Sequence, residues 1–183
     1  MKQRPPNFIV HYSRGEPFRS ITSAAPHQLH DVLNSLDEKN SWGLKRFADP
    51  TYLEQRFEVE RLMRARFIAM GGAPVLSAPI YFFLGHNKRF EEHRLNIGYA
   101  IDLVHLHRNS ISFSYGDTML SFNVENRKVA GEKYRNPLCD RLFMLDELED
   151  LFNNDFSPSR SPLAVEAQLW VSPTNEIVRK LER

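Results

Sequence analysis

The chain has 183 residues, 42% of them hydrophobic and 26% charged, a composition typical of one globular domain. Lysine and arginine number 24 against 23 aspartate and glutamate, so the net charge of +1 excludes a uniformly basic nucleic-acid-binding or membrane-binding protein. The single cysteine, Cys139, excludes an intramolecular disulfide framework. Together with the lack of an export signal or a membrane-length apolar run, it predicts a cytoplasmic protein with no membrane partner.

The first half of the chain predicts one strand and two helices. Residues 8–12 are aromatic and β-branched, which is typical of a strand, and turn residues follow them. Helical spacing of leucine and valine predicts a helix over residues 26–38. A longer helix is expected to begin at Asp49 and Pro50 and to end at Gly71. Most of its charged residues are predicted to occupy a solvated face, namely Glu58, Glu60, Arg61, Arg64 and Arg66.

The second half predicts mainly strands. The continuous apolar run 79–85 is typical of a central strand that is buried on both faces, and 100–106 is a further strand candidate. Residues 110–115 alternate polar and apolar, which predicts a strand with one apolar face. Residues 140–152 have helical spacing, and 164–171 predict a last strand.

Strands that alternate irregularly with two to three flanking helices predict one α+β domain over residues 1–183, with a mixed or antiparallel central sheet. No internal repeat is present. The near-neutral total charge hides a division along the chain. Residues 1–139 carry 19 basic and 14 acidic side chains, and residues 140–155 carry one basic and six acidic. A polyanionic partner therefore remains compatible with a local patch.

Two polar clusters are candidates for binding or chemistry. His11, Tyr12, Ser13 and Arg14 follow one another at the end of the first strand, where such groups can bind a polar ligand or merely satisfy backbone groups. Glu166 and Gln168 share the polar face of the last strand, beside Trp170. That face is unremarkable on an edge strand in water. If it lines the same cleft as His11, a carboxylate there can orient a ribose and stabilise positive charge at its anomeric carbon.

Three segments resemble ADP-ribosyltransferase-like proteins related to the DarT toxins. Residues 8–21 look like the opening strand of these proteins, which carries a histidine and then a hydroxyl residue. Residues 113–120 are similar to a later aromatic strand, and residues 166–171 resemble the strand that bears the catalytic glutamate. The resemblance covers these three segments and implies an ADP-ribosyltransferase-like fold.

The resemblance also implies a use of NAD as substrate and an assignment of site residues. His11, Tyr12, Ser13 and Arg14 would contact NAD, Tyr81 or Tyr115 would stack on the nicotinamide, and the catalytic position would be Glu166 or Gln168. A glutamine there would carry no charge, which leaves open a degenerate member of the family. Arg14 and Arg46 are the candidates for the arginine that DarT-like enzymes use. The acceptor would be a nucleic acid or a protein.

Two other functions compete with ADP-ribosyl transfer. One is a module on the same fold that binds a partner without chemistry. The other is a metal-dependent hydrolase or nuclease, for which the ligands would be His86, His93, His105 and His107. No metalloprotease signature supports this second alternative, and none of the site residues predicted for NAD is predicted to bind a metal.

Overall fold

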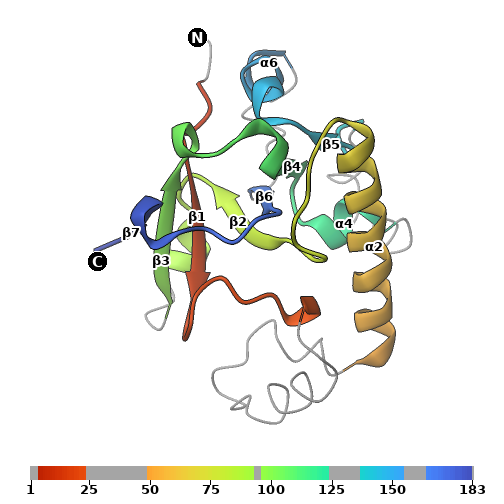
Figure 1. Cartoon of the computed structure of the whole chain (residues 1–183), viewed down its shortest axis with the longest axis horizontal. Helices are drawn as coiled ribbons and strands as arrows, with labels where there is room; N and C mark the ends of the chain where they lie inside the picture. Colours follow the sequence, from red (N-terminus) through yellow and green to blue (C-terminus); the bar gives the residue numbers. More distant parts are fainter. Residues whose placement is uncertain (1–3, 24–48, 93–95, 124–136, 155–163, 183) are drawn as a thin grey trace.

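A computed structural model describes residues 4–23, 49–92, 96–123, 137–154 and 164–182 (Figure 1). All seven strands of the central sheet pair antiparallel, in the order β5-β4-β6-β2-β1-β3-β7. The fold class is therefore α+β with an antiparallel central sheet, as predicted. The strands are β1 (Phe8–Ser13), β2 (Ile80–Leu84), β3 (Ile97–Asp102), β4 (Ile111–Tyr115), β5 (Leu142–Phe143), β6 (Val165–Leu169) and β7 (Val178–Lys180).

The described residues also form four α-helices and five short 3₁₀ turns. The helices are α2 (Pro50–Ala69), α3 (Lys88–Glu91), α4 (Thr118–Phe122) and α6 (Leu148–Asn154). The turns are Ile21–Ser23, Leu103–His105, Arg108–Ser110, Leu145–Glu147 and Asn175–Ile177. None of these helices is both long and apolar enough to span a lipid bilayer.

Helix α2 has the ends that the sequence predicts. The side chain of Asp49 accepts a hydrogen bond from the backbone N–H of Thr51, and Pro50 is the first helical residue, where its missing N–H costs nothing. At the other end, Gly71 has a φ of +92°, a left-handed conformation that glycine adopts without strain. Local sequence thus determines the position of this helix along the chain.

The two faces of the sheet have different cores. Helices α2 and α4 cover one face, where the ring of Phe67 stacks on the buried Trp170 at a centroid distance of 5.6 Å. The opposite face carries the larger apolar cluster, which includes Phe82, Phe113 and Tyr115. Figure 1 shows α2 running along one side of the sheet, and the register of the strands decides which side chains face it.

The last predicted strand, β6, lies inside the sheet rather than at its edge. It pairs with β2 on one side and with β4 on the other. Gln168 and Trp170 are consequently fully buried, and the expectation that this polar face could meet water as on an edge strand is wrong for these two residues. Serine hydroxyls accept hydrogen bonds from both side chains: Ser112 accepts from the Trp170 indole N–H, and Ser114 accepts from the Gln168 amide.

Two predicted elements differ in the structure. In the predicted helix 140–152, residues of β5 instead pair with β4, and α6 begins only at Leu148. This happens because burial against β4 outweighs the helical spacing of the leucines. The predicted strand 100–106 ends at Asp102, and His105 lies in a 3₁₀ turn. His105 and His107 therefore do not share a strand face. The predicted helix 26–38 lies outside the described residues.

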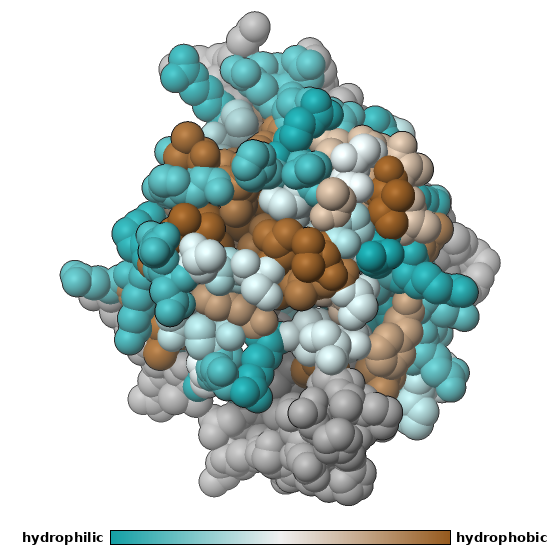
Figure 2. Space-filling model, in the orientation of Figure 1, coloured by the Kyte–Doolittle hydropathy of each residue, from teal (hydrophilic) through white to brown (hydrophobic). Residues whose placement is uncertain are grey.

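The surface has apolar side chains in separate groups among hydrophilic ones, as Figure 2 shows for one face. Among the described residues, Val75 and Val104 are the most exposed large apolar ones, with relative exposures of 78% and 85%. Because single exposed apolar side chains are normal in soluble proteins, these positions do not by themselves mark a binding surface.

Candidate functional site

A cavity of about 220 Å³ lies where α2 meets strands β1, β2 and β6. It brings together residues that are far apart in the sequence, among them four of the predicted site residues, His11, Tyr12, Tyr81 and Glu166. Its lining consists of His11, Tyr12, Arg19, Ser20, Ile21, Thr22, Arg56, Glu60, Tyr81, Phe83, Phe90, Asp117 and Glu166.

Glu166 contributes a half-buried carboxylate to this cavity. It stands opposite Phe83 in β2 and Ser114 in β4, so the neighbouring strands flank it on both sides. Its Oε2 accepts hydrogen bonds from the backbone N–H of Thr118 at 2.9 Å and from the hydroxyl of the same residue. Burial, and then the nearby Asp117 carboxylate, raises the pKa of Glu166 to about 7. This side chain therefore changes its charge near neutral pH.

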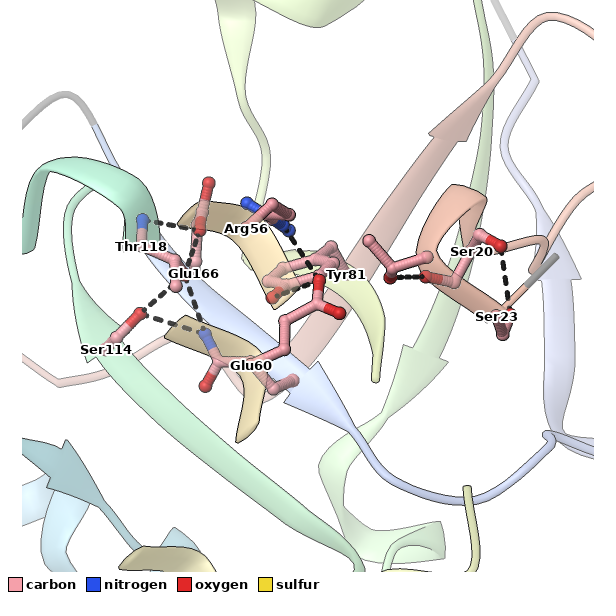
Figure 3. A network of polar contacts seen from close by, with 10 residues as sticks. Ser20, Ser23, Arg56, Glu60, Tyr81, Ser114, Thr118 and Glu166 are labelled. Atoms are coloured by element: carbon pink, nitrogen blue, oxygen red, sulfur yellow. Dashed lines mark hydrogen bonds and ion pairs between the residues drawn. The ribbon is translucent and has the colours of Figure 1, made fainter. Parts of the chain in front are cut away.

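An ion pair on α2 forms the opposite wall. The Nε of Arg56 donates to Oε1 of Glu60 at 2.8 Å, and both side chains are almost completely buried. The hydroxyl of Tyr81 donates to the same oxygen at 3.0 Å, and the Arg56 guanidinium lies 4.0 Å from the centre of the Tyr81 ring. Figure 3 shows these three side chains next to Glu166. The cavity thus contains an aromatic ring that contacts an arginine on its face and a carboxylate at its hydroxyl.

The charges in the cavity influence one another strongly. Burial works to lower the pKa of the Arg56 guanidinium, but Tyr81, Glu60 and Glu166 outweigh it, and the pKa is raised. Burial raises the pKa of the Tyr81 phenol well above its ordinary value. Arg56 therefore stays cationic and Tyr81 stays a neutral donor. With Asp117 included, the carboxylates outnumber the buried arginine, which favours a ligand that carries positive charge.

His11 lines the edge of the cavity but offers it no free nitrogen. Its Nδ1 lies 2.8 Å from the Tyr81 carbonyl oxygen, and its Nε2 accepts from the backbone N–H of Phe18. Nδ1 must therefore carry the proton, and burial lowers the pKa of the ring, so the imidazole is neutral. The ring also packs against Phe82, on the face of the sheet opposite to Glu166. His11 thus holds the segment after β1 in place.

The other residues of the first cluster differ in their placement. Tyr12 lines the cavity, and its hydroxyl donates to Glu91 and accepts from the backbone N–H of Asn87. Ser13 bonds within its own turn to residues 15 and 16, and Arg14 donates to Asn96. Neither of these two side chains lines the cavity. The segment that contacts the cavity comes later, at residues 19–22.

The structure separates the paired alternatives that the sequence left open. Of the two predicted tyrosines, Tyr81 lines the cavity, whereas Tyr115 is buried in the apolar cluster on the opposite face. Tyr115 is therefore not positioned to stack on a ligand in this cavity. Glu166 lines the cavity and Gln168 does not, because the Gln168 side chain is fully buried and bonded to Ser112 and Ser114.

The sequence analysis assigned neither Arg56 nor Glu60 to a site. It placed Glu60 on the solvated face of α2. That assignment is wrong, since the relative exposures are 9% and 3%. A signal was present: the two residues are in helical phase with the buried residues Val59, Met63 and Phe67. The sequence instead names Arg14 and Arg46 as candidates for the arginine that DarT-like enzymes use. Arg46 lies outside the described residues.

The metal hypothesis gains no support from the part of the chain that the structure describes. Within those ranges no three histidine, cysteine or carboxylate side chains gather as a metal site requires. His93, one of the proposed ligands, lies outside them. His86 pairs instead with Glu91 on the surface.

A larger cavity, of about 890 Å³, shares Tyr12 with the first one. Its walls include His86, Glu91 and Lys180, which are exposed. Size alone does not mark a site. The smaller cavity is the candidate functional site because the buried Arg56 and Glu60 converge there with Glu166.

No family model, no curated protein and no solved structure matches the chain. The geometry of the cavity is therefore the basis on which a function can be argued.

Proposed function

We propose that the protein is an NAD-dependent ADP-ribosyltransferase whose acceptor is a nucleic acid or a protein. The observation that carries the proposal is the convergence of Tyr81, Glu166 and Arg56 on one cavity. An aromatic ring can stack on the nicotinamide ring, and a carboxylate can orient the adjoining ribose. The three segments that resemble DarT-like proteins support the same chemistry.

In the proposed reaction, the bond between C1′ of the ribose and N1 of nicotinamide breaks. Its electron pair leaves with nicotinamide, and positive charge develops on the ribose. A nucleophilic atom of the acceptor then bonds to C1′ and releases its proton to solvent. The ionised Glu166 stabilises the developing charge, which is worth more in a buried site than in water. The positive charge of Arg56 partly balances the negative charges of Glu60 and Glu166.

The size of the cavity limits which part of NAD it receives. Pockets for drug-sized ligands usually measure roughly 300–1,000 Å³, whereas this cavity measures about 220 Å³. It suits the nicotinamide and its ribose, with the remainder of the dinucleotide outside. One face of the Tyr81 ring is covered by the Arg56 guanidinium, so nicotinamide would stack on the other face.

The test is transfer of label from adenine-labelled NAD to DNA, RNA or total protein. We expect transfer by the wild type and a loss of at least about 100-fold in the Glu166→Gln variant, which keeps the size of the side chain but not its charge. Transfer by the wild type should rise with pH through about 7, because Glu166 ionises there.

Glu176→Gln is the matched control, since Glu176 is exposed and lies outside the cavity. It should transfer label as the wild type does. The proposal is wrong if the wild type labels no acceptor class, or if Glu166→Gln transfers as much label as the wild type.

A second candidate is binding of a partner without chemistry. It is favoured by His11, whose two ring nitrogens are both used within the protein. Calorimetric titration with NAD, together with the label-transfer assay, distinguishes the two functions. Binding without transfer supports the module, whereas transfer that depends on Glu166 supports the enzyme.

A further inference from the structure

One carboxylate oxygen in the cavity has no donor. Oε1 of Glu60 accepts from both Arg56 and Tyr81, but Oε2 is buried and has no hydrogen-bond partner among the described residues. The Glu60 side chain is only 4% exposed and lines the cavity. A buried acceptor left unpaired costs free energy, so a ligand that supplied a donor would recover that cost on binding.

The position of Glu60 relative to Tyr81 limits which group of a ligand can reach it. The Tyr81 hydroxyl donates to Glu60, so the carboxylate lies at the tip of the tyrosine ring (Figure 3). A flat ring stacked on Tyr81 would direct a substituent at its edge toward the same carboxylate. The matching chemistry is an N–H donor on an aromatic ring, because a second carboxylate would be repelled.

We propose that Glu60 determines the specificity of the cavity for a carboxamide-bearing ring, with Oε2 accepting a hydrogen bond from the amide nitrogen of nicotinamide. The inference rests on the proposed use of NAD and adds a residue that selects the leaving group. Arg56 holds Glu60 in position through Oε1 and balances its charge, so selection depends on the hydrogen bond as well as on net charge.

The test compares two dinucleotides that differ at one group. NAD carries a carboxamide, and nicotinic acid adenine dinucleotide carries a carboxylate at the same position. We expect the wild type to bind NAD at least about tenfold more tightly, since a charged hydrogen bond is lost and a repulsion gained with the acid. Calorimetric titration of the intact chain with each dinucleotide measures the ratio.

The variant Glu60→Gln replaces the free acceptor with an amide that donates. It should weaken NAD binding roughly tenfold and strengthen binding of the acid, so that the preference disappears or reverses. Glu58→Gln on the same helix is the control, because Glu58 is exposed and its change should leave the ratio as it is in the wild type.

The outcomes separate this inference from the proposed function. NAD binding by the wild type with the same preference in Glu60→Gln overturns the role of Glu60 and leaves the proposed function standing. Failure of the wild type to bind NAD overturns both. If Glu60→Gln does not fold because Arg56 is left unpaired, the double variant Arg56→Gln/Glu60→Gln removes both charges. Its preference is then compared with that of Arg56→Gln alone, and equal preferences overturn the inference.

Discussion

Glu166 shows how a single residue can join the proposed function to stability in this protein. It lies on β6, between β2 and β4, and its carboxylate has hydrogen bonds from Thr118 on one oxygen and a like charge, Asp117, nearby. Removing this carboxylate from water costs free energy, and the carboxylate lies where the proposed reaction would develop positive charge. Strained or costly groups of this kind concentrate at functional sites.

The raised pKa of Glu166 predicts a stability that depends on pH. Because the folded state binds the proton more tightly than the unfolded chain, stability is greatest below the ordinary glutamate pKa and falls as pH rises toward about 7. Glu166→Gln should therefore raise the free energy of unfolding by about 1–2 kcal/mol at pH 8 and leave it nearly unchanged at pH 4.

Urea denaturation of the wild type and the variant at both pH values measures the difference. Glu176→Gln serves as the control, since that exposed side chain should give no pH-dependent gain. An equal effect of Glu166→Gln at pH 4 and pH 8 would show that the carboxylate is not desolvated as the structure indicates.

Among the elements, α2 has two roles that its sequence displays unequally. The residues at its two ends are visible in the sequence, and the structure confirms them at Asp49 and Gly71. Its second role is to place Arg56 and Glu60 at the cavity, and the sequence did not predict this role. Charged residues on an amphipathic helix are usually solvated, and only the position of the sheet shows that these two are covered.

The N-cap of α2 yields a prediction for this element. Asp49→Ala removes the acceptor for the Thr51 N–H and should cost about 1 kcal/mol of stability. Chemical denaturation measures it, with Glu58→Ala, an exposed mid-helix change, as the control. A loss no larger than that of the control would mean that the cap does not hold the first turn.

Strand β6 illustrates a limit at the same scale. Its alternation correctly predicted that Glu166 and Gln168 share a face, and the register confirms this. Alternation does not tell an edge strand from a central one, because both have period two. Pairing with β2 and β4 buried Gln168 and left Glu166 at the cavity.

At the scale of the whole molecule, the site depends on the assembly of several elements. Strands β1, β2 and β6, helix α2 and residues 19–22 each contribute to the cavity walls. A ligand held there would contact all of them and would oppose unfolding of the whole sheet. Binding to the native state alone stabilises a protein by mass action.

We therefore predict that NAD raises the midpoint of thermal unfolding. At a concentration of 100 times Kd the gain is about 2.7 kcal/mol, which corresponds to roughly 5–10 °C for a chain of this size. Tyr81→Leu should abolish the shift relative to its own baseline, whereas Glu176→Gln should retain it. A shift that survives in Tyr81→Leu would place NAD binding elsewhere.

The sequence by itself determined the local features of this protein: the α+β class, the ends of α2, most strands, and the faces of β4 and β6. These follow from side-chain periodicity and from capping residues, which act over a few positions. It also named Tyr81 and Glu166 as candidate site residues, each with an alternative that it left open. Tertiary structure alone decided that these two meet Arg56 and Glu60, that Tyr115 faces away, and that 140–152 is not one helix. Strand order and register are long-range interactions, and they decide which side chains are buried together.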